Sequence, residues 1–250
     1  MERATRATIH RATPKRRHRR ELAADWLKPA LFAGLGIVTV ALLAWGIEYA
    51  VSTYHDRIAL AGKSGDRSRV AIVIAGETLT IPANMIRFPA TRGGGTFESV
   101  DLLLHWPSLE GYSQDRTDAF RDGSTLAPLV YVTIAPRDNQ LDSDGRLVAV
   151  YERFFIGDAV AGPSGLTGRR MTDDSGYRGE EVYYAVNGST RFAARCIAES
   201  TAEVPATCIR DVNIGAGLTM LYRFNRFYLV DWQKMDADLK QLAATFLKPR

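Results

Sequence analysis

Side chains able to do acid–base or metal chemistry are scarce in this chain. Of the four histidines, His10 and His18 lie in a basic N-terminal head, His55 lies beside an apolar span, and only His105 lies in the part expected to fold. A catalytic triad or a zinc site needs several such groups at one place. We therefore predict no catalytic residue, no metal and no cofactor, and we interpret His105 as a side chain on the face of a sheet.

Two pairs of neighbouring acids, Asp173-Asp174 and Glu180-Glu181, are the remaining candidates for hydrolytic chemistry. Two carboxylates that face each other across a cleft can hydrolyse a glycosidic bond. Neighbours in a strand point to opposite faces, however, so adjacency in sequence works against that geometry. We predict a solvated hairpin here, and a carboxylate hydrolase stays as the residual alternative to a non-enzymatic protein.

Two polar loops partly match known ligand-binding motifs. Gln140–Gly145 (QLDSDG) resembles the start of a calcium loop, but its first position is Gln140 and its twelfth is Tyr151, where that loop needs acids. The glycine triplet at 93–95 lacks the lysine of a phosphate-binding loop. We predict a hairpin turn at 142–145 and a flexible turn at the triplet.

Cys196 and Cys208 are the only cysteines. Each lies at the inner end of a predicted strand, on the side of the membrane expected to be oxidising. We predict a disulfide that closes a β-hairpin. A redox site usually has more closely spaced cysteines of the CxxC kind, which are absent here.

Two segments contain the residue types of a binding surface. Ile81–Tyr112 combines an amide, arginines, an acid and aromatics, as a cleft for a polar ligand or a glycan does, and Tyr222–Trp232 interleaves arginines with aromatics. The same contents are equally explained by a long loop between two strands, and by a strand whose arginine stems cover neighbouring rings. The candidate surface residues are Asn84, Arg87, Arg92, Trp106, Glu110, Tyr112, Arg223 and Arg226.

An uncharged run of 19 residues, Pro29–Ile47, follows the basic head. At about 1.5 Å per residue its length is close to the roughly 30 Å hydrocarbon core of a bilayer. We predict a transmembrane helix over residues 29–50, a disordered cytosolic head over 1–28 and a linker over 51–68. The excess of Lys and Arg before the run places the N-terminus in the cytosol. The alternative, a cleaved signal peptide, would have a shorter apolar region and small residues at the cleavage site.

The charge of the chain is concentrated in that head. The formal net charge is +4, but residues 1–55 hold 9 of the 32 Lys and Arg and 4 of the 28 Asp and Glu, which leaves 23 and 24 for the rest. The folded part is close to neutral, so we predict no nucleic-acid binding. The head fixes topology and can contact anionic lipids.

Short apolar segments with turn residues between them predict a mainly β domain over residues 69–250: an antiparallel sheet, a sandwich or an open barrel. A period of three and four residues predicts an amphipathic helix over 231–247 that begins with Asp231 as its N-cap. A short helical turn is expected at 82–88. The expected strands are 70–75, 77–81, 100–106, 129–135, 147–156, 182–186, 191–197, 207–213 and 218–229.

These features predict a single-pass protein of the plasma (inner) membrane with an extracytoplasmic, periplasmic domain. We expect it to be a non-enzymatic interaction protein whose partners are the lipid bilayer and other envelope proteins. The alternative is a membrane-tethered module that binds cell-wall glycan or another polar ligand. Ala30 and Gly34 form a small-xxx-small pair that can support helix association, so a homo-oligomer is a further expectation.

Overall fold

The computed structural model describes residues 18–121, 127–138, 141–187, 190–198 and 206–247. Predictions for residues 1–17, and for Gln140 in the calcium-like loop, lie outside these ranges. The chain divides into two compact units, Met1–His55 and Asp56–Arg250.

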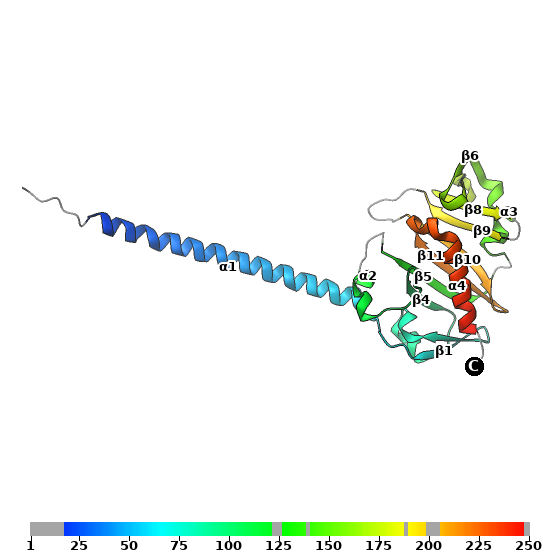
Figure 1. Cartoon of the computed structure of the whole chain (residues 1–250), viewed down its shortest axis with the longest axis horizontal. Coiled ribbons are helices and arrows are strands. Elements are labelled where there is room, and N and C mark those ends of the chain that lie inside the picture. Colours follow the sequence, from blue (N-terminus) through cyan, green and yellow to red (C-terminus); the bar gives the residue numbers. More distant parts are fainter. Residues whose placement is uncertain (1–17, 122–126, 139–140, 188–189, 199–205, 248–250) are drawn as a thin grey trace, which may run out of the picture. The chain divides into compact units, whose positions relative to one another are not determined.

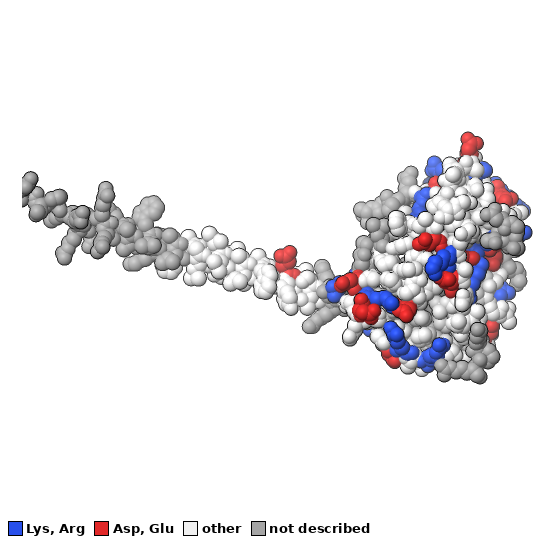
Figure 2. Space-filling view, in the orientation of Figure 1, with Lys and Arg blue, Asp and Glu red and all other residues white. Residues whose placement is uncertain are grey.

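Helix α1 (His18–Leu60) contains the predicted span. Its segment Phe32–Tyr54 is long and apolar enough to cross a membrane, and none of it is buried. Glu48 is the only charged residue of this segment, which appears almost entirely white in Figure 2. The helix extends beyond both ends of the 29–50 span, into residues 18–28 of the predicted head and 51–60 of the predicted linker.

The second unit is mainly β, as the sequence predicts (Figure 1). An eight-stranded sheet has the order β4-β5-β11-β10-β9-β8-β7-β6, with all neighbours antiparallel. A smaller sheet has the order β2-β1-β3. The strands are β1 (Arg69–Ile74), β2 (Glu77–Pro82), β3 (Gly95–Thr96), β4 (Val100–His105), β5 (Leu129–Pro136), β6 (Phe155–Ala161), β7 (Thr167–Met171), β8 (Glu180–Asn187), β9 (Thr190–Ile197), β10 (Thr207–Ile214) and β11 (Leu218–Asn225).

The two faces of the large sheet differ in burial. In β5, Val130, Val132 and Ile134 are buried, whereas Tyr131 between them is exposed and Thr133 is half-buried. The neighbouring strands β11 and β10 show the same alternation. Because side chains alternate between faces along a strand, one face packs into the core and the other stays partly open.

Helix α4 (Trp232–Leu247) covers the core face together with the small sheet. Figure 1 shows it lying against β10 and β11. Its buried residues recur at three- and four-residue steps, as predicted, although Leu242 of the expected stripe is only half-buried. The helix begins one residue after Asp231. The buried residues are Trp232, Met235, Asp236, Leu239, Ala243 and Phe246.

The predicted strand at 147–156 and the predicted hairpin turn at 142–145 before it are wrong. Residues Ser143–Ala149 form helix α3, followed by a 3₁₀ turn at Tyr151–Phe154, and β6 pairs with β7. The carboxylate of Asp142 accepts a hydrogen bond from the Gly145 amide at 3.1 Å and caps the helix, where the sequence indicated a hairpin turn. Leu147 and Tyr151 are buried four residues apart, which is a helical spacing.

The predicted strand at 218–229 is too long. Strand β11 ends at Asn225, and a 3₁₀ helix, η7 (Arg226–Asp231), follows it. The side chain of Asn225 accepts a hydrogen bond from the Phe227 amide at 2.7 Å. Asparagine favours such local turns over continued strand pairing. The predicted helical turn at 82–88 is a short 3₁₀ helix at Ala83–Met85. Two further short elements are a 3₁₀ helix at Pro89–Gly93 and helix α2 (Thr117–Arg121).

Strands β9 and β10 pair over only two residue pairs, Cys196–Cys208 and Arg195–Ile209. Each of them is paired along its whole length with its other neighbour, β8 or β11. The large sheet therefore consists of two halves that meet at this short ladder, and the Cys196–Cys208 disulfide joins the halves there.

Candidate binding surface on the open sheet face

The open face of the large sheet carries a cavity of about 700 Å³. Its walls come from β4, β5, β8, β9, β10 and β11, and also from the segment around Arg87. A second hollow of about 440 Å³ shares Thr133, Arg195, Ile209 and Leu221 with it, so the two form one groove along the strands. The groove residues used below are Arg87, Asp101, Tyr131, Thr133, Glu180, Arg195, Ile209 and Arg223.

Strand register sets the floor of this groove. Arg223 of β11 lies opposite Tyr131 of β5 and opposite Ile209 of β10. Because directly paired residues project to the same face, with Cβ atoms about 5 Å apart, these three side chains form one row across the sheet. Tyr131 is 40% exposed, and Arg223 is also exposed.

Charged side chains of the groove have partners within the fold, and only the ion pair among these contacts neutralises charge. Arg195 forms an ion pair with Glu180 at 2.7 Å. The carboxylate of Asp101 accepts a hydrogen bond from the Thr133 hydroxyl at 2.6 Å. The guanidinium of Arg87 lies over the Tyr131 ring, 5.4 Å from its centroid, a cation–π geometry.

Two arginines remain available for a ligand. Within the described parts of the chain, neither Arg87 nor Arg223 has an acidic side chain within ion-pair distance. Both side chains are exposed. This end of the groove can therefore accept an acidic group between two cations and an aromatic ring.

Three of the candidate surface residues in Ile81–Tyr112 form hydrogen bonds to other groups of the folded unit. Asn84 is 7% exposed, and its amide donates to the Tyr112 carbonyl at 3.0 Å. The Arg92 guanidinium donates to the carbonyls of Ile86 and Arg87. Trp106 is only 3% exposed, and its indole N–H donates to Asp231 at 3.2 Å. The ring of Trp106 therefore belongs to the core and does not form a surface platform.

Glu110 and Tyr112 also have internal partners. Glu110 forms an ion pair with Arg116, and the Tyr112 ring packs edge-on against Phe120. His105 hydrogen-bonds Ser108 at 3.1 Å. Burial and the charge of Arg116 lower the pKa of His105, against a smaller opposing effect of Glu110, so its ring is neutral near pH 7. The prediction that His105 lies on a sheet strand is confirmed.

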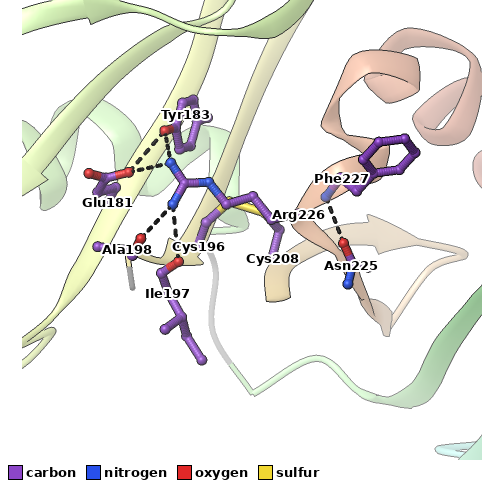
Figure 3. Close-up of a disulfide and its surroundings, with 9 residues drawn as sticks. All are labelled: Glu181, Tyr183, Cys196, Ile197, Ala198, Cys208, Asn225, Arg226 and Phe227. Atoms are coloured by element: carbon purple, nitrogen blue, oxygen red, sulfur yellow. Dashed lines mark hydrogen bonds and ion pairs between the residues drawn. A yellow bond between two sulfur atoms is a disulfide. The ribbon is translucent and has the colours of Figure 1, made fainter. Parts of the chain in front are cut away.

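Arg226 ties the two halves of the sheet together beside the disulfide (Figure 3). Its guanidinium forms an ion pair with Glu181 at 2.8 Å and contacts the Tyr183 hydroxyl, both on β8. It also donates to the carbonyls of Ile197 and Ala198. Of the two candidate arginines in 222–232, Arg223 thus faces the groove, and Arg226 links the two halves of the large sheet.

The acid pair Glu180-Glu181 splits between the two faces, as expected for neighbours in a strand. Glu180 pairs with Arg195 and Glu181 with Arg226. Asp173 and Asp174 are exposed in a 3₁₀ turn between β7 and β8. Among the described residues, no group of three or more His, Cys, Asp or Glu could hold a metal ion.

A buried polar network lies where β9 and β10 separate. Arg210 is fully buried, and its guanidinium binds Asp144 of α3 through two contacts at 2.5 and 2.9 Å and Asp236 of α4 at 2.9 Å. It also donates to the Ala193 carbonyl of β9 at 3.0 Å. The guanidinium thus occupies the gap in the ladder and links two helices to the sheet.

The Asp236 carboxylate accepts hydrogen bonds from three side chains of this network, Arg210, Tyr222 and Lys240. Burial by itself raises the pKa of Asp236, but the charge of Arg210 and hydrogen bonds from Arg210 and Lys240 outweigh it and hold that pKa below its usual range. The Tyr222 hydroxyl donates to the same carboxylate at 2.8 Å, and burial raises the pKa of Tyr222. The network is satisfied internally and has a structural role.

Sequence reasoning missed Tyr131, Thr133, Glu180 and Arg195 as groove residues. For the first two, a signal exists in the segment LVYVTIA, where polar or amphipathic residues alternate with buried Val130, Val132 and Ile134. For Arg195 the signal is the predicted Cys196–Cys208 hairpin, because antiparallel pairing of the two cysteines places Arg195 opposite Ile209.

Comparison with known proteins leaves this chain without a family. No family model matches it, and no curated protein sequence matches it. Two solved structures resemble it at 16% and 15% identity. One is Smlt3025, an immunity protein of the Stenotrophomonas maltophilia type IV secretion system, with a TM-score of 0.49, covering 73% of this chain and 94% of that chain. The other is the Neisseria meningitidis iron-regulated outer membrane lipoprotein FrpD, with a TM-score of 0.47 and coverages of 74% and 95%. At these values the likeness carries no functional conclusion.

Proposed function

We propose that this chain is a single-pass, membrane-anchored envelope protein that acts without catalysis, by binding an acidic segment of a partner protein in the groove on its open sheet face. The observation that carries this proposal is the row Tyr131–Arg223–Ile209 on the floor of the 700 Å³ cavity, with Arg87 over the Tyr131 ring.

Shape and charge both favour a peptide-like ligand. The groove continues into the second hollow along the strand direction, so it is elongated. Aromatic and arginine side chains are the types that dominate binding energy at protein interfaces. Arg87 and Arg223 present planar donors that suit carboxylates.

The topology is part of the proposal. The basic residues before Pro29 support a cytosolic N-terminus, and the disulfide supports an oxidising compartment for the folded unit. A C-terminal reporter enzyme that works only outside the cytosol should be active on the full chain. A second reporter that works only in the cytosol should be inactive at the same position, and its activity would place the folded unit in the cytosol.

Site-specific photo-crosslinking in native membranes tests the interaction. A photoreactive residue in place of Tyr131 should yield a discrete protein adduct, whereas one in place of exposed Gln233 on α4 should not. Arg223→Ala should reduce the Tyr131 adduct severalfold, and Arg178→Ala, at an exposed arginine outside the groove, should leave it unchanged. Equal adducts at both positions, or none at Tyr131, would refute the proposal.

The competing function, binding of wall glycan, has one observation in its favour. Tyr131 is a partly exposed ring beside Thr133 and Asp101, which can donate to and accept from hydroxyls. The full chain in detergent should not sediment with purified wall material if the groove binds protein. Sedimentation that Arg223→Ala abolishes would favour the glycan module instead.

A further inference from the structure

The groove on the open sheet face carries opposite charges at its two ends. In the cavity of about 700 Å³, Arg87 and Arg223 are exposed and lie outside any ion pair among the described residues. Of the described acids that line this cavity, only Asp101 lies outside an ion pair, so cations are in excess there. At the other end, in the hollow of about 440 Å³, the exposed acid Asp138 lies in the wall.

The other charged side chains of this second hollow neutralise one another or a neighbour. Arg146 forms an ion pair with Asp211, and Arg195 forms one with Glu180 at 2.7 Å. Within the described ranges, Asp138 has no cation within ion-pair distance. The second hollow therefore has a net negative charge that is open to a ligand.

The floor of the second hollow consists of short and apolar side chains. Ala135 of β5 lies directly opposite Thr219 of β11, and Leu221 lies opposite Thr133 two residues further along. Directly paired residues project to the same face, so these four side chains form a shallow floor. The aliphatic stem of a lysine or arginine covers such a floor while its charged head reaches a polar rim. A basic side chain thus fits this hollow, with its head at Asp138.

Strand β5 sets the distance between the two ends. Tyr131 lies at the cationic end, and Pro136, two residues before Asp138, lies five positions further along β5. A rise of about 3.3 Å per residue makes this distance roughly 17 Å. An extended ligand has the same rise, so its two charged residues should lie about four to six positions apart, given the reach of their side chains.

We propose that the groove selects an extended segment that carries an acidic residue at one end, for Arg87 and Arg223, and a basic residue about four to six positions away, for Asp138. This inference rests on the proposed function, since it takes the groove to bind a protein segment, and it adds a charge order to that segment. A segment that is acidic throughout would bring a like charge to Asp138, and like charges brought together across an interface disfavour the wrong partner.

Selection from a library of random dodecapeptides displayed on phage, with the full chain immobilised in neutral detergent, tests the inference. Peptides enriched by the wild type should share an acid and a base about four to six positions apart. Asp138→Lys should reverse the second preference, so that its enriched peptides carry an acid where the wild type selects a base. Asp158→Lys, at an exposed acid of β6 outside the groove, should leave the wild-type pattern unchanged.

One enriched peptide, made synthetically, gives the size of the effect. It should bind Asp138→Asn and Arg223→Ala severalfold more weakly than the wild type, and Asp158→Asn equally well. Replacing its base by alanine should weaken binding to the wild type but not to Asp138→Asn, because the contact is already lost there.

The outcomes separate this inference from the proposed function. Peptides that share an acid but no base at a set distance, or a pattern that Asp138→Lys leaves unchanged, would refute the charge order and leave the groove as a site for an acidic segment. Enrichment that Arg223→Ala does not reduce would place binding outside the groove, for example at the basic head, and would refute both. The adduct at Tyr131 in native membranes reports on the proposed function by itself.

Discussion

Replacement of Arg210 by methionine is the sharpest test of how the two halves of the sheet are held together. The guanidinium of Arg210 is fully buried and donates to Asp144, Asp236 and the Ala193 carbonyl. Methionine fills most of the volume but removes the guanidinium donor from two carboxylates and one carbonyl, and Asp236 keeps only Tyr222 and Lys240 as donors. Removing one partner of a buried ion pair costs about 3 to 5 kcal/mol.

A loss of this size is readily measured. For a folded unit of this length, 1 kcal/mol lowers the melting temperature by about 2 to 4 °C, so Arg210→Met should lower it by roughly 10 °C. Thermal unfolding of the full chain in detergent, followed by near-ultraviolet circular dichroism, reports on Trp106 and Trp232 in the folded unit. The signal of helix α1 in the far ultraviolet would mask the change.

Two further variants make the test decisive. Arg195→Met breaks the ion pair between Arg195 of β9 and Glu180 of β8, whose side chains are 24% and 28% exposed. It should cost less than about 1 kcal/mol. Tyr222→Phe removes a single hydroxyl from Asp236 and should cost about 1 kcal/mol, which keeps the test valid if Arg210→Met does not fold. Equal losses for Arg210→Met and Arg195→Met would refute the role assigned to the buried network.

Three other predictions follow from the same structure. The Cys196→Ala/Cys208→Ala double variant should lose about 3 kcal/mol of unfolding free energy in denaturant titrations, because the disulfide closes a loop between residues 12 apart; a variant as stable as wild type would contradict this. Asp236 has a folded pKa below its unfolded value of about 3.9, so its stabilising contribution is present above pH 4 and is lost as the pH falls through the folded pKa. In Asp236→Asn the unfolding free energy should therefore fall less steeply below about pH 4 than in wild type, and an equally steep fall would contradict this. Trp106→Ala should cost about 3 to 5 kcal/mol, since it empties a core site and frees Asp231, and an unchanged melting temperature would show that Trp106 is a surface residue after all.

The sequence predicts the elements whose residue pattern is local, and it fails where tertiary packing selects between two structures. Strands β1, β2, β4, β5, β8, β9 and β10 are found within a residue or two, because each is a short apolar or alternating run between turn residues. Helix α4 follows from its own three- and four-residue periodicity. The segment 142–156 fails because Asp142-Ser143-Asp144-Gly145 suits a turn and a helix N-terminus equally, and packing of Leu147 and Tyr151 on β7, β8 and β9 selects the helix.

The candidate surface was predicted only in part. Arg87 and Arg223 were named from composition and do line the groove. Asn84, Arg92 and Trp106 were named for the same reason and instead satisfy backbone and core groups. Residue type alone cannot separate these cases, because an arginine that binds a carbonyl and an arginine that faces solvent have the same local sequence pattern.

The sequence by itself determined the apolar span, the basic head, the β-rich class and the pairing of the two cysteines, since each depends on residues near one another in the chain or on composition. Tertiary structure alone decided which face of the sheet stays open, how β9 diverges from β10, and which arginines are left without an acidic partner among the described residues. The physical reason is that these properties arise from strand register and long-range packing, which join residues such as Arg210 and Asp144 that lie 66 positions apart.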